Sequence, residues 1–308
     1  MTVIRVGTRR SALATAQTTL VLNELRAAHP SVTFEIVFIS TEGDERRDVS
    51  LRAIAGQGVF VKRIEQALID GSIDLAIHSL KDMPTAIEPG LIIAAVPTRA
   101  DTRDALVLPV GTPRQGISIA GDPLSILPTG ARVGTGSPRR AVQLTARRPD
   151  LTILDIRGNV DSRLRKLDDG DYDAIVLAVA GLQRLGQSDR ISVFLGSDVM
   201  VPMIGQGALA LEARANDQVV IDIARSLDDA TSHTCVDAER AFLATLGSGC
   251  ALPVGALATM RNGHVTLITA IETEAGIVRR TETCSPGDAV AVARRIARPF
   301  VSTAPALP

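Results

Sequence analysis

The chain has 308 residues, 45% of them hydrophobic and 22% charged, a balance typical of a soluble globular protein with two or three domains. Its formal net charge is −1 and only 2% of the residues are aromatic. This argues against a general nucleic-acid-binding protein, which is usually basic and stacks bases on aromatic rings. No uncharged apolar run reaches the roughly 18 residues of a membrane span, and the N-terminus lacks the apolar core of a signal peptide. The three cysteines form no CxxC pair, and no HExxH occurs. We therefore expect a cytoplasmic protein that contacts no membrane and holds no metal.

The first hundred residues alternate short apolar strands with amphipathic helices. The expected strands are 3–7, 34–40, 73–77 and 91–96, and the expected helices are 11–28 and 59–70. This alternation predicts a parallel, doubly wound sheet. Ser11 is a candidate N-cap. The free amides of the helix N-terminus and Arg9 would then point toward the same place and could bind an anion. The charged, glycine-rich segment 41–58 is too long for a tight connection and is expected to form a functional loop.

The rest of the chain predicts two further units. A second α/β set has expected strands at 105–108, 132–134, 152–156 and 174–179, with helices up to 147 and up to 168. After residue 217 the order changes to helices 217–228 and 235–246, strands 254–259, 265–271 and 276–281, and a helix at 288–297. Helices followed by a three-strand meander are typical of a small α+β domain. The predicted domains are 1–98 with 200–216, then 99–199, then 217–308.

Residues 73–84, IDLAIHSLKDMP, end an apolar strand in a polar cluster that consists of His78, Ser79, Lys81 and Asp82. In an open α/β sheet, ligands bind at the carboxyl ends of strands. Several other strand-to-helix turns carry arginines, whose guanidinium forks suit carboxylates or phosphates. A single arginine is more often solvated surface, but several at equivalent turns favour an anion site. The cationic set is Arg9, Arg10, Lys62, Lys81, Arg139, Arg140, Arg157, Arg163 and Arg184.

Cys250 lies in a glycine turn, Gly247-Ser-Gly-Cys250, just before an expected strand. A buried inert thiol is the default for any cysteine, and we expect it for Cys235 and Cys284. The turn around Cys250 also allows its side chain to project into a cleft as a covalent attachment point. The residues alone leave both interpretations open.

With these residues collected, the chain resembles the porphobilinogen deaminase family over nearly its whole length. Eight ordered segments carry the resemblance: GTRRSALA (7–14), GVFVKRIEQAL (58–68), DLAIHSLKDMPT (74–85), VGTGSPRRAVQL (133–144), RRPDLTILDIRGNVDSRL (147–164), YDAIVLAVAGLQRLG (172–186), GQGALALE (205–212) and GSGCALPVG (247–255). The resemblance implies two domains like periplasmic binding proteins with the site between them. It also implies a third, smaller α+β domain whose cysteine holds a dipyrromethane cofactor by a thioether.

The resemblance further implies a reaction and the residues that carry it. Four porphobilinogen molecules would add in turn, each losing ammonia, to give hydroxymethylbilane on a monomeric enzyme. Asp82 would be the catalytic acid and base, and Cys250 would hold the dipyrromethane. The cofactor-side positions are Lys81, Asp82, Ser137, Arg139, Arg140 and Arg163, and the substrate-side positions are Arg9, Ser11, Gln17, Arg157, Arg163 and Arg184.

Three positions depart from the family pattern: Gln57 replaces a usual Lys, Gly136 a usual Ser, and Ser248 a usual Gly. A competing interpretation is a non-enzymatic anion-binding protein on the same two-domain scaffold. It accounts for the arginines but leaves Cys250 and the third domain without a role. A nucleic-acid-binding module is a distant third interpretation.

Overall fold

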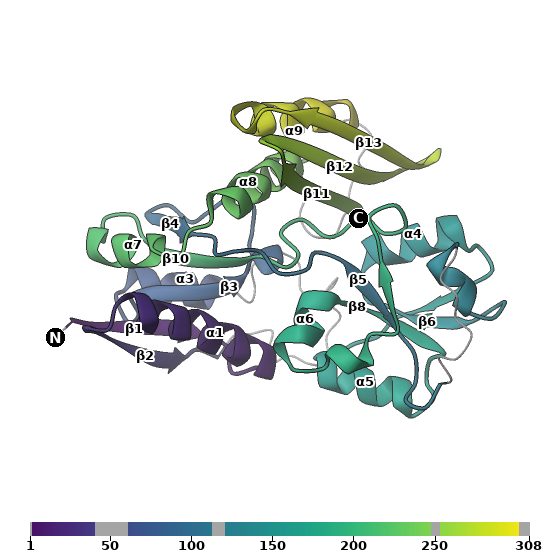
Figure 1. The fold of residues 1–308 in the computed structure, drawn as a ribbon, viewed down its shortest axis with the longest axis horizontal. Helices are drawn as coiled ribbons and strands as arrows, with labels where there is room; N and C mark the ends of the chain where they lie inside the picture. The colour runs from purple at the N-terminus through teal and green to yellow at the C-terminus, as the bar shows by residue number, and fades with distance from the viewer. Residues whose placement is uncertain (1, 41–60, 113–120, 248–252, 302–308) are drawn as a thin grey trace.

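The computed structural model describes residues 2–40, 61–112, 121–247 and 253–301. These residues form two five-stranded sheets and one three-stranded sheet, each packed against helices. Figure 1 shows the two larger units side by side and the three-stranded unit above their junction. The predicted fold class, two α/β units with a small α+β unit, is confirmed.

The first sheet has the order β2-β1-β3-β10-β4. Its strands are β1 (Thr2–Thr8), β2 (Val32–Phe38), β3 (Leu75–Ser79), β4 (Leu91–Ala95) and β10 (Leu209–Arg214). β1 is parallel to β2 and β3, as predicted. β10 is antiparallel to β3 and β4, so the prediction of a wholly parallel sheet is wrong. The chain returns from the second unit and inserts this strand from the opposite direction.

Helices cover both faces of the first sheet. α1 (Ala12–Ala28) and α7 (Gln218–Arg225) pack in one core with β1, β3 and β10, and α3 (Lys62–Ile69) covers the other face. Successive side chains along each strand point to opposite faces of the sheet, so alternate residues pack against the two helix layers. The predicted boundary at residue 217 assigned α7 to the third domain, whereas Val220, Ile221 and Ala224 lie in the core of the first sheet.

The second sheet has the order β7-β6-β8-β5-β9, again mixed, because β5 is antiparallel to β8 and β9. Its strands are β5 (Asp104–Val107), β6 (Arg132–Gly134), β7 (Thr152–Leu154), β8 (Ala174–Ala178) and β9 (Val193–Leu195). α4 (Pro138–Arg147) covers one face, and α5 (Val160–Asp168) with α6 (Val179–Arg184) covers the other. The residues that follow β8 directly are therefore helical.

The third unit contains α8 (Ala230–Thr245), β11 (Val254–Arg261), β12 (His264–Thr273), β13 (Gly276–Cys284) and α9 (Ala289–Ala297). The strands form the predicted antiparallel meander, and both helices pack on one face around Phe242. Short 3₁₀ turns complete the fold: η1 (Leu80–Asp82), η2 (Pro123–Ile126), η3 (Ser188–Arg190), η4 (Pro286–Asp288) and η5 (Arg298–Phe300). The described part contains no helix with the length and apolar character needed to cross a bilayer.

Candidate active site at the junction of the sheets

The η1 turn, residues 80–82, follows β3 directly and presents Lys81 and Asp82. Asp82 is exposed and Lys81 is half-buried. The Leu80 amide donates to the Ala208 carbonyl at 3.1 Å, and the Met83 amide closes the turn on the Leu80 carbonyl at 3.1 Å. Gly205 has a φ of +70°, and a Cβ there would overlap the Leu80 side chain and lie 3.2 Å from the Lys81 nitrogen. A glycine at this position therefore lets the returning chain press against the turn.

His78 does not join the exposed polar cluster that the sequence predicted. Its side chain lies in the interior, where Nε2 is 3.0 Å from Oε2 of Glu212 on β10. Ser79 faces the opposite layer, where its hydroxyl exchanges hydrogen bonds with the Gln17 amide at 2.8 and 3.0 Å. The reason is the alternation of side chains along β3, which sends consecutive residues to opposite faces.

Asp104 opens β5 and is completely buried. Arg139 Nη1 donates to its Oδ2 at 2.8 Å, and Arg140 donates to its Oδ1 from Nε at 3.0 Å and from Nη2 at 2.7 Å. The Gln206 amide adds a fourth donor at 3.1 Å. The two arginines predicted to bind a cofactor thus first satisfy a carboxylate of the protein itself.

We expect Asp104→Asn to lower the free energy of unfolding by about 3–5 kcal/mol, because two buried guanidinium groups lose their counter-charge. Burial alone would raise the pKa of Asp104, but Arg139 and Arg140 hold that pKa well below its usual range. The stabilisation is therefore present above the ordinary carboxyl pKa and is lost as pH falls through the lower folded-state pKa. Urea unfolding at neutral and acid pH measures both effects. Asp173→Asn, which breaks an exposed pair with Arg132, is the matched control and should change stability far less.

Basic side chains from both larger units influence one another around the Asp82 turn and Asp104. Burial lowers the pKa of Lys81 to about 8; Asp82 and Asp104 oppose this shift, whereas Arg140 and Arg139 add to it. Burial also lowers the pKa of Arg163 to about 10, with Arg140 and Arg157 acting in the same direction. Arg140 acts on both Lys81 and Arg163, so these effects connect five cations in sequence, namely Lys81, Arg139, Arg140, Arg163 and Arg157. The carboxylates among them are Asp82, Asp104 and Asp155, the last bound by Arg157 at 2.7 Å, so positive charge is in excess.

The substrate-side positions of the first unit lie at the carboxyl end of β1. Ser11 is the N-cap of α1, as predicted, and its Oγ accepts from the Ala14 amide at 3.3 Å. Arg9 is half-buried just before it. Gln17 is buried, and both atoms of its amide engage Ser79, so it joins α1 to β3.

Arg184 ends α6 and reaches the segment by which the chain returns to the first unit. Its Nη2 donates to the Gly207 carbonyl at 2.7 Å, while its Nε is buried without a partner in the described part. Burial lowers its pKa to about 10. Arg184 also lines a hollow of about 340 Å³ beside α1, together with Leu20, Pro97 and Thr98. Arg184 therefore lies where the two larger units meet.

Ser137 is the N-cap of α4, although its hydroxyl makes no capping bond and its amide instead donates to Thr135 Oγ1 at 3.2 Å. A Cβ at Gly136 would lie 2.9 Å from the Ile156 carbonyl oxygen. The departure from the family pattern at this position thus has a local cause, since a serine would require the neighbouring β7 segment to shift. Gln57 and Ser248 lie outside the described residues.

The third unit is attached to the other two through α8. Glu239 on α8 is fully buried, binds Arg99 with both carboxylate oxygens at 2.6 and 3.0 Å, and accepts from the Gly205 and Ala258 amides. Arg240 Nη2 donates to the Pro84 and Thr85 carbonyls at 2.8 and 3.0 Å. One helix therefore contacts Arg99 and Gly205, where the chain passes between the first two units, and the chain just after Asp82.

Of the three cysteines, Cys250 lies outside the described residues. Cys235 is buried in the core of the third unit, and burial raises its pKa to about 11, which is typical of an inert thiol. Cys284 is a half-buried free thiol.

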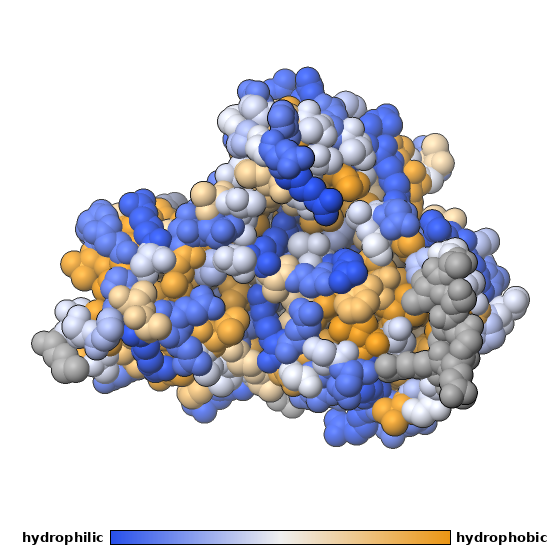
Figure 2. Space-filling model, in the orientation of Figure 1, coloured by the Kyte–Doolittle hydropathy of each residue, from blue (hydrophilic) through white to orange (hydrophobic). Residues whose placement is uncertain are grey.

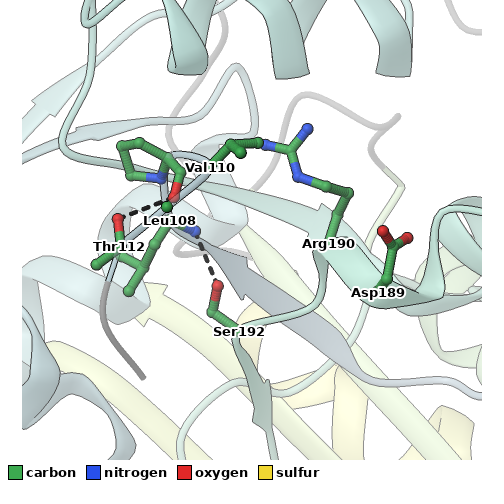
Figure 3. Close-up of a pocket in the computed structure, with 8 residues that line it drawn as sticks. Leu108, Val110, Thr112, Asp189, Arg190 and Ser192 are labelled. Atoms are coloured by element: carbon green, nitrogen blue, oxygen red, sulfur yellow. Dashed lines mark hydrogen bonds between the residues drawn. The ribbon is translucent and has the colours of Figure 1, made fainter. Parts of the chain in front are cut away.

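A second hollow, of about 230 Å³, lies at the far end of β5 (Figure 3). Leu108, Val110, Arg190 and Ser192 line it, and the Leu108 amide donates to Ser192 Oγ at 3.0 Å. None of the predicted site residues lines it. This hollow is therefore separate from the Asp82 turn.

Glu65 on α3 is a further buried carboxyl group, close to His78 and Glu212. Burial and the charge of Glu212 raise its pKa, and His78 partly opposes this. A raised folded-state pKa favours folding below the ordinary carboxyl pKa, and this contribution is lost as pH rises through the folded-state value.

We therefore expect Glu65→Gln to remove part of this pH dependence. As pH rises from the ordinary carboxyl pKa through the raised folded-state pKa of Glu65, the stability of the variant relative to the unaltered protein should increase. Urea unfolding across this range measures the change. Glu274→Gln, at an exposed hairpin position, is the control and should follow the unaltered protein at every pH.

The comparisons with known proteins agree with this arrangement. Residues 4–222 match the family model "Porphobilinogen deaminase, dipyromethane cofactor binding domain", and residues 233–301 match "Porphobilinogen deaminase, C-terminal domain". The chain belongs to the porphobilinogen deaminase family. Porphobilinogen deaminases similar to it include those of Roseiflexus sp. (strain RS-1), 50% identical over 85% of this chain and 83% of the relative, and of Acidothermus cellulolyticus, 47% identical over 98% and 89%. That of Syntrophotalea carbinolica is 44% identical over 97% of this chain and 92% of the relative. Among solved structures, the methionine-binding protein MetQ aligns with 73% of this chain and 89% of its own at 12% identity and a TM-score of 0.45.

The residues at the junction fit the cofactor of a porphobilinogen deaminase. A dipyrromethane carries several carboxylates, and the five cations connected through Arg140 outnumber the carboxylates among them. Arg139 Nε is buried without a partner among the described residues, a donor that a ligand carboxylate or a water could satisfy. Lys81, Arg139, Arg140 and Arg163 are thus suitably placed for such a group.

Sequence reasoning missed three residues that shape the site: Asp104, Glu212 and Glu239. Asp104 had a local signal, since it is an acid directly before the apolar run ALVL. Glu212 also interrupts an apolar segment, four residues after Ala208. Glu239 lies in an amphipathic helix, and nothing in the sequence distinguishes it from a solvent-exposed glutamate.

Proposed function

We propose that this chain catalyses the porphobilinogen deaminase reaction at the junction of its first two units, with Asp82 as the carboxylate that holds and moves the proton. The observation that carries the proposal is the exposed Asp82 at the end of β3, next to Lys81 and within the electrostatic influence of the arginines that the second unit contributes. Figure 2 shows strongly hydrophilic side chains where the third unit meets the other two.

Asp82 suits the two demands of this chemistry. When the amine of porphobilinogen leaves as ammonia, positive charge develops on the substrate, and a nearby carboxylate that accepts the pyrrole N–H stabilises it. The α-carbon of the bound pyrrole chain attacks this cation, and once the new carbon–carbon bond has formed that α-carbon must lose its proton, which Asp82 can take. The dipyrromethane, when bound, supplies the pyrrole to which the first substrate adds. Exposure of Asp82 lets it reach a substrate without a backbone rearrangement.

The basic residues hold the carboxylates of cofactor and substrate in this proposal. Lys81, Ser137, Arg139, Arg140 and Arg163 act on the cofactor side, and Arg9, Ser11, Gln17, Arg157, Arg163 and Arg184 on the substrate side. Two of these residues have partners in the protein that limit what they can offer a ligand: Gln17 through Ser79, and Arg140 through Asp104 and the Val176 carbonyl. We therefore expect Gln17 and Arg140 to position neighbouring groups as well as to contact a ligand directly.

We also propose that Cys250 attaches the cofactor, that the domains follow the predicted boundaries except at α7, and that the protein is a cytoplasmic monomer. The unpaired thiols of Cys235 and Cys284 are consistent with a reducing compartment. Gel filtration at several concentrations tests the monomer, which should elute at a constant volume.

The proposed function is tested with the unaltered protein. We expect its intact mass to exceed the sequence mass by two pyrrole units, and porphobilinogen to be converted to hydroxymethylbilane with release of one ammonia per substrate. The competing function, anion binding without chemistry, requires a protein of unmodified mass that binds porphobilinogen and leaves it intact.

A further inference from the structure

The buried pair His78–Glu212 joins two neighbouring strands of the first sheet. His78 on β3 and Glu212 on β10 lie on the face covered by α3, and their side chains are 5% and 0% exposed. Nε2 of His78 is 3.0 Å from Oε2 of Glu212. Backbone pairing already sets the register here, with Ala210 opposite His78 and Glu212 opposite Ala76. Strand pairing therefore does not need the side-chain contact.

Stability does not account for the pair. Taking two polar or charged groups out of water is costly, and replacing a buried pair with apolar residues of similar volume is often neutral or stabilising. In addition, Glu212 Oε1 and Glu65 Oε1 are buried without a partner among the described residues. The charged groups nearby are Glu65 from α3 and Arg240 from α8, which both feel the charge of Glu212. Because an apolar interior of similar volume is often at least as stable, folding alone gives no reason for the pair.

The position of His78 suggests a role for the pair. The next residue, Ser79, is held by Gln17 from the opposite face, and the amide of the following Leu80 is held by Ala208. After the turn, the Pro84 and Thr85 carbonyls are held by Arg240. The turn that presents Asp82 is thus fixed at both ends, and His78–Glu212 is a polar side-chain contact on the α3 side just before the turn starts.

We propose that Glu212 and His78 are positioning residues that orient the η1 turn, and through it the Asp82 carboxylate, for proton transfer. Neither touches the substrate. The inference rests on the proposed function of Asp82 and extends it to two residues that lie in the core. Small displacements of a reacting group can cost of order 10²-fold in rate, which sets the scale of the expected effect.

The test is an apolar replacement of both members, His78→Leu with Glu212→Met. We expect the cofactor adduct by mass and the urea midpoint to be retained, KM for porphobilinogen to be unchanged, and kcat to fall by about 10- to 10²-fold. Glu212→Gln, which keeps an acceptor for His78, should retain more of kcat than the double variant. A double variant with full kcat overturns the proposal, and so does one that loses adduct or stability in proportion to its rate.

A second arm asks whether the pair acts through Asp82. On an Asp82→Asn background, replacing the pair should leave the remaining rate unchanged, because there is no carboxylate to orient. An equal loss on both backgrounds contradicts positioning of Asp82. If Asp82→Asn alone turns over at the normal rate, the assignment of Asp82 fails and the positioning role fails with it. If instead Asp82→Asn is slow and the double variant keeps its full rate, only the positioning role fails and the assignment of Asp82 stands.

Discussion

Cys250→Ser protein should carry no dipyrromethane adduct and form no hydroxymethylbilane. A thiolate is the nucleophile that can form and keep a thioether, and a serine hydroxyl at neutral pH does not replace it. Intact mass before and after purification, with an assay of product formation, measures both losses. The fold should survive, because serine and cysteine side chains are nearly the same size.

The other two cysteines are the matched controls. Cys235→Ser and Cys284→Ser should keep the adduct and the activity, since burial raises the pKa of Cys235 to about 11 and leaves it inert. Trypsin separates the three thiols onto different peptides, 226–240, 241–261 and 281–294. An adduct found on a peptide other than 241–261 contradicts the assignment of Cys250.

Asp82→Asn should lower kcat by about 10²–10⁴-fold while the cofactor adduct remains attached. Asparagine keeps the shape of the side chain but neither takes up the α-carbon proton nor offsets the charge that develops as ammonia leaves. Single-turnover measurement of ammonia release on adduct-bearing protein isolates the chemical steps. Because Asp82 is exposed, the urea midpoint should change little.

Two further variants sharpen this result. Asp82→Glu keeps the charge and should retain more activity than Asp82→Asn. Asp169→Asn, at an exposed position after α5, controls for the removal of a surface carboxylate and should turn over normally. Near-normal turnover in Asp82→Asn would mean that another carboxylate handles the proton.

The sequence by itself determined the order of units, most strands and helices, and the turns that bring Asp82 and the arginines to strand ends. These features are local: an apolar run predicts a strand, and Ser11 caps α1 within one helical turn. The family also followed from contiguous segments, each short enough to be read along the chain.

Only the tertiary structure decided which of these residues point at a ligand and which satisfy one another. His78 and Glu212 are 134 positions apart, and Asp104 is 35 from Arg139. The strand β10 was overlooked for the same reason, since its place between β3 and β4 depends on a return from the second unit. Side-chain periodicity predicts that a residue is buried on one face of a strand, but it does not identify the charged residue that it contacts there. That pairing is set by the packing of distant segments, where a buried charge must find its counter-charge.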